Sequence, residues 1–292
     1  MADTVTSDKK IPASITLSGG RVLSFARPLV MGIINVTPDS FSDGGQFLAV
    51  DHAVGHALKL IEEGADLIDI GGESSRPGAE MTPVEDDIQR VLPVVEQLRA
   101  QTDIPISVDT YKAAVAEKAL LAGADIINDI SALRMDSEMV RVAAQSGAPV
   151  VLMHMLGTPQ TMQQNPCYDN CVAEIIAFLA QRIAFATQHG VARARLIVDP
   201  GIGFGKRVQD NLDLLAQLES FSQFGLPILV GASRKSFIDK VAGTGASSAE
   251  RVGGSIAAAV IALMHGVSIV RVHDVATTVE ALRVAKAVVG KK

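Results

Sequence analysis

Short apolar runs alternate with longer segments of helical pattern along almost the whole chain. In the first helical segment, Val50, Val54 and Leu58 recur at helical spacing, and the opposite face carries His52 and Lys59. The short runs are apolar at consecutive positions, which is typical of parallel strands covered on both faces. The pattern therefore predicts an α/β fold built on a parallel sheet.

Strand-like runs and helical segments pair up eight times. The predicted strands are residues 30–35, 67–71, 106–109, 126–129, 149–154, 196–199, 227–231 and 269–273. The predicted helices are residues 50–63, 83–99, 112–121, 137–145, 171–189, 211–217, 253–264 and 277–289. Eight β–α units in succession fit a closed (β/α)8 TIM barrel, and a doubly wound open sheet is the competing topology.

Two further short strands, residues 15–17 and 22–25, precede this array. They flank the segment Ser18-Gly19-Gly20-Arg21, and a tight turn with two glycines predicts a β-hairpin. We expect this hairpin to cap the barrel bottom, the face at the N-terminal ends of the strands. Residues 1–14 are expected to form a flexible tail and residues 15–292 a single domain, because no linker or shift of composition divides the chain.

The composition supports a large buried core and limits the classes of partner. Hydrophobic residues make up 48% of the 292 residues and charged residues 20%, unlike a disordered chain. No apolar run approaches the roughly 18 residues of a membrane helix. The net charge of −6 argues against binding to nucleic acid or to an anionic membrane. Residues 1–10 lack the apolar region of a secretory signal, and Cys167 and Cys171 make no disulfide framework, so we expect a cytoplasmic protein.

Nearly every predicted strand ends in a polar or reactive side chain. These side chains are Asn35, Asp69 with Glu73, Asp109, Asn128, His154, Asp199, Ser233-Arg234-Lys235, and Arg271 with His273. In a barrel, the carboxyl ends of all strands meet at one face, where TIM-barrel active sites lie. Helix capping is the alternative for single members such as Asp109 or Ser233, although it does not explain the whole series.

The chemistry of these strand ends indicates the kind of ligand. Asp109, Asn128 and Asp199 offer acceptors and one amide, which suit a ligand with adjacent N–H and NH2 donors. A set of cationic side chains at the same face suggests a phosphate ester or carboxylate as substrate. This set consists of Arg76, Arg234, Lys235, Arg271 and His273. Two Gly- and Ser-containing loops, residues 35–45 and 71–78, are predicted to be mobile active-site loops.

Eight motifs in sequence resemble those of the dihydropteroate synthases. They are MGIINVTPDSFSDGG from Met31, DIGGESSRPGA from Asp69, SVDT from Ser107, NDI from Asn128, MHMLGTPQTMQ from Met153, DPGIGFGK from Asp199, ASRKSF from Ala232 and RVHDV from Arg271. The resemblance covers every barrel unit and implies a bacterial, monofunctional enzyme of folate biosynthesis, a sulfonamide target. Such an enzyme condenses 6-hydroxymethyl-7,8-dihydropterin pyrophosphate with p-aminobenzoate to 7,8-dihydropteroate and pyrophosphate. The one departure is Ser75, where threonine is common in the family.

The resemblance also implies roles for individual residues. The pterin is expected to contact Asp109, Asn128, Met153, Asp199 and Lys235. p-Aminobenzoate is expected to contact Ser75, Arg76, Pro77, Phe204 and Ser236. The pyrophosphate is expected to contact Asn35, Arg76, Arg271 and His273, with Asn35 as the protein ligand of a Mg2+ ion. The implied catalytic residues are Asp39, Lys235, Arg271 and His273. The loop with Asp39 and Phe41 is expected to close over the reacting methylene group.

The implied reaction depends on charge stabilisation more than on proton transfer. As the pyrophosphate leaves, Mg2+, Arg271 and His273 would stabilise the charge on it, and Asp39 would stabilise positive charge on the pterin side. An aromatic amine is neutral at pH 7 and needs no strong base, so positioning should dominate.

Three other functions remain as alternatives. A methyltetrahydrofolate–corrinoid methyltransferase would share the pterin-binding acids but has no need of Lys235, Arg271 and His273. A non-catalytic pterin-binding paralogue would bind pterin without turnover. A phosphosugar-binding barrel would lack the set of Asp109, Asn128 and Asp199.

Several weaker signals have simpler explanations. His52 and His56 have metal-binding spacing but fit a solvated helix face better. The glycines of residues 201–205 lack the spacing of a dinucleotide-binding loop. His154 is either a ligand contact or a structural hydrogen-bonding residue. The apolar helix 253–264 is either deeply buried or part of a subunit interface, and since the family is typically dimeric through late helices, we expect a homodimer.

Overall fold

The structure is a computed structural model that describes residues 11–36, 45–76 and 78–289. Asp39, Phe41 and Pro77 lie outside the described residues, so the roles predicted for them stay predictions.

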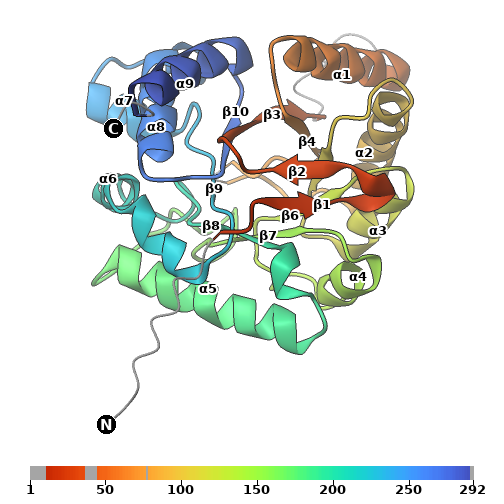
Figure 1. The fold of residues 1–292 in the computed structure, drawn as a ribbon, viewed down its shortest axis with the longest axis horizontal. Helices are drawn as coiled ribbons and strands as arrows, with labels where there is room; N and C mark the ends of the chain where they lie inside the picture. The colour runs from red at the N-terminus through yellow and green to blue at the C-terminus, as the bar shows by residue number, and fades with distance from the viewer. Residues whose placement is uncertain (1–10, 37–44, 77, 290–292) are drawn as a thin grey trace.

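Eight parallel strands form the centre of the fold (Figure 1). They are β3 (Leu29–Asn35), β4 (Leu67–Gly71), β5 (Ile106–Asp109), β6 (Ile126–Asp129), β7 (Val150–Met153), β8 (Leu196–Asp199), β9 (Leu229–Val230) and β10 (Ile269–Val272). Their order is β8-β7-β6-β5-β4-β3-β10-β9, and a parallel bridge between Val198 and Ile228 joins the two ends. The sheet is therefore a closed barrel. This confirms the predicted TIM barrel and excludes the doubly wound sheet.

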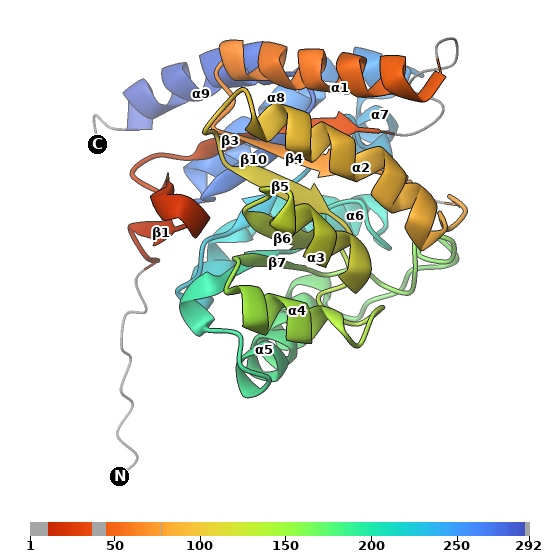
Figure 2. The ribbon, with the colours of Figure 1, turned by 90° about the vertical axis from the view of Figure 1, so that its right-hand side faces the viewer.

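Helices surround the barrel on its outside (Figures 1 and 2). They are α1 (Gly45–Glu62), α2 (Val84–Arg99), α3 (Ala113–Leu121), α4 (Met139–Ser146), α5 (Cys171–Gln188), α6 (Val208–Ala216), α7 (Ser236–Ala242), α8 (Val252–Met264) and α9 (Val275–Val289). Short 3-10 turns are η3 (Arg193–Arg195), η4 (Leu218–Phe224) and η5 (Ser248–Glu250). Each helix covers the outer face of the strands with an apolar stripe, which explains why these strands are apolar at consecutive positions.

Two helices differ from the sequence prediction. α6 begins at Val208, three residues earlier than predicted, because the carboxylate of Asp210 accepts a hydrogen bond from the backbone N–H of Arg207 (2.7 Å) and so caps the helix. α7 was not predicted at all. It has seven residues, of which only Phe237 and Ile238 are buried, so its apolar pattern is too short to reveal a helix.

α5 is long and apolar enough, by length and composition, to cross a membrane. In the structure it is a core helix of the barrel. Its buried residues Cys171, Ile175, Leu179 and Ile183 recur every four positions and belong to the main core cluster. The side chain of Asn170 caps its first turn by accepting from the N–H of Ala173 (3.0 Å).

The N-terminal hairpin closes one end of the barrel, as predicted. Its strands β1 (Ser14–Thr16) and β2 (Val22–Ser24) are antiparallel and are joined by the 3-10 turn η1 (Ser18–Gly20). Its inward side chains Ile15 and Leu23 pack in one buried cluster with strand residues at the N-terminal ends, among them Leu67 and Ile269. Figure 1 shows the hairpin crossing in front of the strands, and Figure 2 shows the strands running away from it.

Inward-facing positions change from apolar to polar along β4, β6, β8 and β10, whereas β7 stays apolar with Met153. Successive inward residues are two apart, because strand side chains alternate between the two faces. Near the hairpin these residues include Leu67, Ile126, Val151, Ile197 and Ile269, which pack in the cluster with the hairpin. Two positions further along lie Asp69, Asn128, Met153, Asp199 and Arg271. The barrel thus has a dry bottom and a polar opposite end, where the candidate site lies.

Candidate active site

Arg271 joins two carboxylates at the centre of the polar end. Its Nε donates to Oδ2 of Asp69 (2.6 Å), and its Nη2 donates to Oδ2 of Asp109 (2.7 Å). The same Oδ2 of Asp69 accepts from Nδ2 of Asn128 (3.0 Å). Side chains of β4, β5, β6 and β10 therefore form one connected network across the barrel, with Asp109 and Asn128 paired in neighbouring strands.

Burial controls the charges of this network. It raises the pKa of Asp109 to about 7; the Arg271 cation opposes this rise, and the nearby Asp69 carboxylate adds to it. Burial alone would lower the pKa of Arg271, but Asp69 and Asp109 together raise it above its usual value. Arg271 is therefore a permanent cation, while Asp109 exchanges its proton near neutral pH.

A second group of predicted residues gathers around the ends of β8 and β9. Lys235 donates from Nζ to the backbone oxygen of Ile202, and its ammonium lies 3.7 Å from the centre of the Phe204 ring. Burial lowers the pKa of Lys235 to about 7, although Asp199 opposes this. Burial likewise raises the pKa of Asp199 to about 6. Met153 is buried beside them, in a cluster with Phe204 and three further methionines.

Gly203 leaves room for the Lys235 side chain. Its φ is +82°, and a Cβ at this position would lie 2.4 Å from Cδ of Lys235. An L side chain is therefore strained here and would also clash with the lysine stem. The glycines of loop 201–205 thus allow the side chain of Lys235 to lie close to the backbone of this loop.

His273 and Arg234 differ from the sequence prediction, which counted both as cations of the site. Burial lowers the pKa of His273 to about 3, and Arg271 and Arg234 lower it further, so the imidazole is neutral at pH 7. Its Nδ1 lies 3.0 Å from Oγ of Ser233. Arg234 is held by both oxygens of Asp274, with Nε 3.0 Å and Nη2 2.5 Å away. The charge of Arg234 is therefore balanced by Asp274. Ser233 contacts His273 and does not cap a helix.

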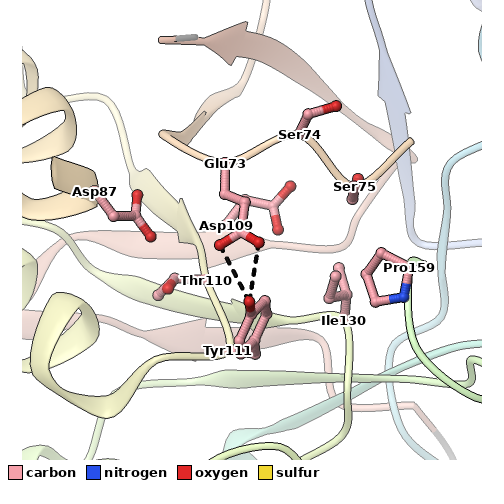
Figure 3. A pocket seen from close by; sticks show the side chains of 9 residues that line it. All are labelled: Glu73, Ser74, Ser75, Asp87, Asp109, Thr110, Tyr111, Ile130 and Pro159. Atoms are coloured by element: carbon pink, nitrogen blue, oxygen red, sulfur yellow. Dashed lines mark hydrogen bonds between the residues drawn. The ribbon is translucent and has the colours of Figure 1, made fainter. Parts of the chain in front are cut away.

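Four side chains tie down the loop that follows β4. The hydroxyl of Tyr111 donates to Glu73 (2.9 Å to Oε1), and Lys112 forms ion pairs with Glu73 and with Asp87 (2.9 Å). Lys112 also donates to the backbone oxygen of Thr82 (2.7 Å). Figure 3 shows the small cavity at this point, which is also lined by Ser75, Asp109, Ile130 and Pro159. Of this cluster, only Glu73 stands out in the sequence, as a polar group after a strand. The loop was predicted to be mobile, but its described residues are anchored through Glu73 and through the backbone of Thr82.

The remaining predicted residues line the rim of the same end. Ser75 is half-buried, while Arg76, Ser236 and Asn35 are exposed. Ser236 begins α7 directly after Lys235, and Asn35 ends β3, whose neighbours are β4 and β10. The structure therefore brings the described members of the predicted set to one face.

His154 has a structural position. It is buried, and its Nδ1 lies 2.9 Å from Nζ of Lys206, whose ammonium also donates to the backbone oxygen of Phe204 (3.0 Å). Burial lowers the pKa of His154 to about 2, so the imidazole is a neutral acceptor for Lys206. The hydrogen-bonding explanation for His154 is therefore favoured over ligand contact. Lys206 is the last residue of the motif that begins at Asp199, but no pattern in the sequence indicates that it contacts His154.

Asn35 carries an amide oxygen, a donor that suits a magnesium ion better than a transition metal. Within residues 11–36, 45–76 and 78–289, no three His, Cys, Asp or Glu side chains are grouped so that they could hold a metal. This also leaves His52 and His56 without a metal-binding cluster in that part of the chain. An exposed amide oxygen at the open end of a strand is a hard ligand, and Mg2+ commonly takes few protein ligands together with water and substrate phosphate oxygens.

Comparisons with known proteins agree with this geometry. Residues 31–273 match a family model described as pterin binding enzyme. The chain is 50% identical over 273 residues to the dihydropteroate synthase of Escherichia coli strain K12, which covers 94% of this chain and 96% of that protein. A structure of Xanthomonas albilineans dihydropteroate synthase with 4-aminobenzoic acid is similar at TM-score 0.87 and 51% identity, covering 92% of this chain and 96% of that one. A Yersinia pestis dihydropteroate synthase with a sulfonamide drug is similar at TM-score 0.89 and 46% identity, covering 95% and 99%. The chain therefore belongs to the pterin-binding enzymes and, among them, to the dihydropteroate synthases.

Proposed function

We propose that the chain condenses 6-hydroxymethyl-7,8-dihydropterin pyrophosphate with p-aminobenzoate, which yields 7,8-dihydropteroate and pyrophosphate for folate synthesis. The observation that carries the proposal is the network of Arg271 with Asp69, Asp109 and Asn128 at the polar end of the barrel. It combines acceptors for a pterin with a cation for a leaving pyrophosphate. Relatives from Xanthomonas albilineans bind 4-aminobenzoic acid and 7,8-dihydropteroate, which supports the same substrates here.

In this proposal the pterin lies inside the polar end of the barrel. Asp199 accepts from the amino and N3 edge, while Asp109 and Asn128 complete the contacts to ring nitrogens. Lys235 donates to the carbonyl side of the ring, and Met153 packs against its face. The pKa values of Asp199 and Asp109, raised by burial to about 6 and about 7, fall when ligand N–H groups donate to the carboxylates.

The leaving pyrophosphate meets the cations at the rim. Arg271 offers the N–H groups that the two carboxylates leave unused, Arg76 is exposed nearby on its loop, and His273 contributes as a neutral donor. Asn35 would hold a Mg2+ ion, which when bound neutralises phosphate charge. Asp39, outside the described residues, is proposed to stabilise the positive charge that develops on the pterin methylene group as its bond to oxygen breaks.

p-Aminobenzoate, the nucleophile, is proposed to bind between the loop after β4 and the start of α7. Ser75, Arg76, Phe204 and Ser236, with Pro77 outside the described residues, would hold the aromatic ring and its carboxylate. The anchoring of the loop by Lys112 supports a defined position for Ser75. The neutral aromatic amine attacks without a strong general base, so orientation supplies most of the rate. Competition by sulfonamides for this position follows from the proposal.

We infer further that the chain is one domain that works as a homodimer in the cytoplasm. Five apolar side chains are exposed on α8 and α9, which pack against each other: Ile261, Met264, Val284, Val288 and Val289. Such a group on neighbouring helices is typical of a subunit interface. α8 buries its other side, with Ala258, Ala259 and Ala262, against the barrel. This supports both explanations for helix 253–264, burial on one face and association on the other.

The function is tested by turnover of the purified protein with the pterin pyrophosphate, p-aminobenzoate and Mg2+. We expect Mg2+-dependent release of pyrophosphate together with dihydropteroate, and a loss of at least about 100-fold in kcat/KM for Lys235→Ala. Pterin binding without any turnover would instead support a non-catalytic paralogue. Transfer of a methyl group from methyltetrahydrofolate would support a methyltransferase, and absence of pterin binding would refute all three.

A further inference from the structure

Asp69 is the residue that the predicted roles leave unexplained, although it lies at the centre of the network. It is fully buried, and one oxygen, Oδ2, accepts both from Nε of Arg271 (2.6 Å) and from Nδ2 of Asn128 (3.0 Å). The other oxygen, Oδ1, is buried and has no hydrogen-bond partner in the described part of the chain. A buried carboxylate with an unpaired oxygen lowers stability, so a reason for its presence is required.

Packing of the barrel does not supply that reason. Asp69 is preceded on the inward face of β4 by Leu67, and its strand neighbours Ile68 and Ile70 are buried and apolar. An apolar residue at position 69 would continue the same pattern. Charge balance of Arg271 supplies only part of the reason, because Asp109 also forms an ion pair with it (2.7 Å).

We propose that Asp69 is a positioning residue that fixes which atoms Asn128 and Arg271 present to the pterin pyrophosphate. This inference deepens the proposed function and rests on it. Asp69 would touch neither substrate and would act through these two neighbours.

The first effect concerns the amide of Asn128. An ionised carboxylate can only accept hydrogen bonds, so the amide must turn its Nδ2 toward Asp69. The opposite orientation would bring the amide oxygen against the carboxylate oxygen, and both atoms carry negative charge. Asp69 therefore leaves the carbonyl oxygen Oδ1 of Asn128 for other contacts. An acceptor at this position suits the N–H and NH2 groups of a pterin.

The second effect concerns the guanidinium of Arg271. Nε is held by Asp69 and Nη2 by Asp109, so two attachments fix the plane of the group. With Asp109 alone, the guanidinium could rotate about a single contact. With both, its remaining N–H donors keep one direction, which is what recognition of a phosphate by arginine requires.

The third effect is electrostatic. The groups that act on Asp109 are Arg271, which lowers its pKa, and Asp69, Asp87 and Asp129, which raise it together with burial. Loss of the charge at position 69 should therefore move the pKa of Asp109 down. Any limb of the pH profile that reports ionisation of Asp109 should shift to lower pH.

The test compares Asp69→Leu with Asp69→Asn. Leucine removes the acceptor and keeps the number of side-chain heavy atoms, although its methyl groups are bulkier than the oxygens. Asparagine has the shape of aspartate and keeps one acceptor oxygen, but it removes the charge and adds an NH2 donor. For Asp69→Leu we expect kcat/KM for the pterin pyrophosphate to fall on the order of 100-fold, with a lower kcat and a raised KM, because misplaced groups lose the productive geometry. Its Tm should fall, because one partner of a buried ion pair is removed and Nδ2 of Asn128 loses its acceptor, so its kinetics must be compared with those of a control variant whose Tm is also lowered. For Asp69→Asn, kcat/KM should fall about tenfold or less. The acid limb of its pH profile should shift to lower pH.

A matched control is Asp125→Asn. Asp125 is also buried and paired with two arginines, Arg21 and Arg99 (2.7 Å each), but it lies beside the hairpin at the other end of the barrel. This variant should lower the Tm and leave kcat, KM and the pH profile unchanged. Binding of 6-hydroxymethylpterin, measured by calorimetry, should be weakened by Asp69→Leu and unaffected by Asp125→Asn.

Two outcomes would overturn the proposal. One is an Asp69→Leu variant with wild-type kcat and KM. The other is a loss of activity that follows a loss of Tm in both Asp69 and Asp125 variants, which would mean a merely structural role. If Asp69→Leu does not fold, an Asp69→Ala variant with wild-type kcat and KM refutes the proposal instead. Absence of turnover in the wild type would refute the proposed function, while calorimetry with 6-hydroxymethylpterin would still test the positioning effect.

Discussion

Nη2 of Arg271 lies 2.7 Å from Oδ2 of Asp109, so the cation proposed for the pyrophosphate is bound to a carboxylate proposed for the pterin. The two substrate halves thus meet side chains that hold each other in position. This pairing links the affinity for the ring to the orientation of the group that stabilises the leaving charge. A change in the ionisation of Asp109 should therefore alter both the stability of the protein and its turnover.

Asp109→Asn should stabilise the protein at high pH. Because burial raises the pKa of Asp109 to about 7, the folded state holds this proton more tightly than the unfolded state, and stability is lost as pH rises through 7. The variant should therefore exceed the wild type in free energy of unfolding at pH 8, by at most about 4 kcal/mol, which corresponds to that change in pKa. Urea unfolding at pH 5 and pH 8 measures the difference. A difference that grows toward pH 5 would contradict the assignment, and turnover should fall at both pH values.

Gly203→Ala should damage the site through Lys235. Its Cβ would lie 2.4 Å from Cδ of the lysine, and φ is +82°, so both the side chain and the loop must shift. We expect about a 10- to 100-fold loss of kcat/KM and a loss of about 1 to 3 kcal/mol in stability.

Gly55→Ala is the control for this change. Gly55 lies in α1, where an added Cβ meets nothing within 4 Å. This variant should be more stable by about 0.5 to 1 kcal/mol, because alanine favours the helix, with unchanged turnover. Steady-state kinetics and thermal unfolding of both variants measure the contrast. If Gly203→Ala had the same kinetics as Gly55→Ala, Lys235 would tolerate the added Cβ and the prediction would be wrong.

Lys112→Met should destabilise the fold and loosen the loop after β4. The lysine pairs with Glu73 and Asp87, whose side chains are 12% and 2% exposed, so its removal leaves two poorly solvated carboxylates close together. A loss of about 3 to 5 kcal/mol is expected from breaking a buried ion pair. KM for p-aminobenzoate should rise more than KM for the pterin pyrophosphate, because Ser75 and Arg76 lie on this loop.

The double variant Lys112→Met with Asp87→Leu separates the two effects of that change. It should recover most of the stability, because an apolar pair replaces the buried charges. The altered KM for p-aminobenzoate should remain, since Glu73 still lacks its cation. A full kinetic recovery would mean that the loop is not held through Lys112.

Met264→Asp should convert the proposed homodimer into a monomer. Met264 is 62% exposed on α8, within the apolar group that α8 and α9 share. A charge within such an interface remains unpaired on association and typically costs several kcal/mol. Light scattering after size exclusion measures the mass. Leu121→Asp, on the 85% exposed Leu121 of α3, is the control and should not change the mass. A monomeric wild type would contradict the interface.

The sequence by itself determined the barrel, its hairpin and the end at which the site lies. Hydrophobic periodicity is a local property of the sequence. Short, mainly apolar runs such as Leu67–Gly71 and Ile126–Asp129 predict covered strands, and the polar residues toward their carboxyl ends indicate the open face. The resemblance of the motifs extended this to the family, which the comparisons confirmed.

Only the tertiary structure decided which side chains meet and what charge they carry. Arg271 binds Asp69 and Asp109 across 202 and 162 residues of sequence, and no local pattern encodes a pairing that depends on barrel closure and strand register. His273 resembles a cation in the sequence, yet burial beside Arg271 makes it neutral, because desolvation and neighbouring charges are properties of the folded environment. Asp69 received no role from the sequence for the same reason: its importance lies in two contacts that exist only once the strands have closed.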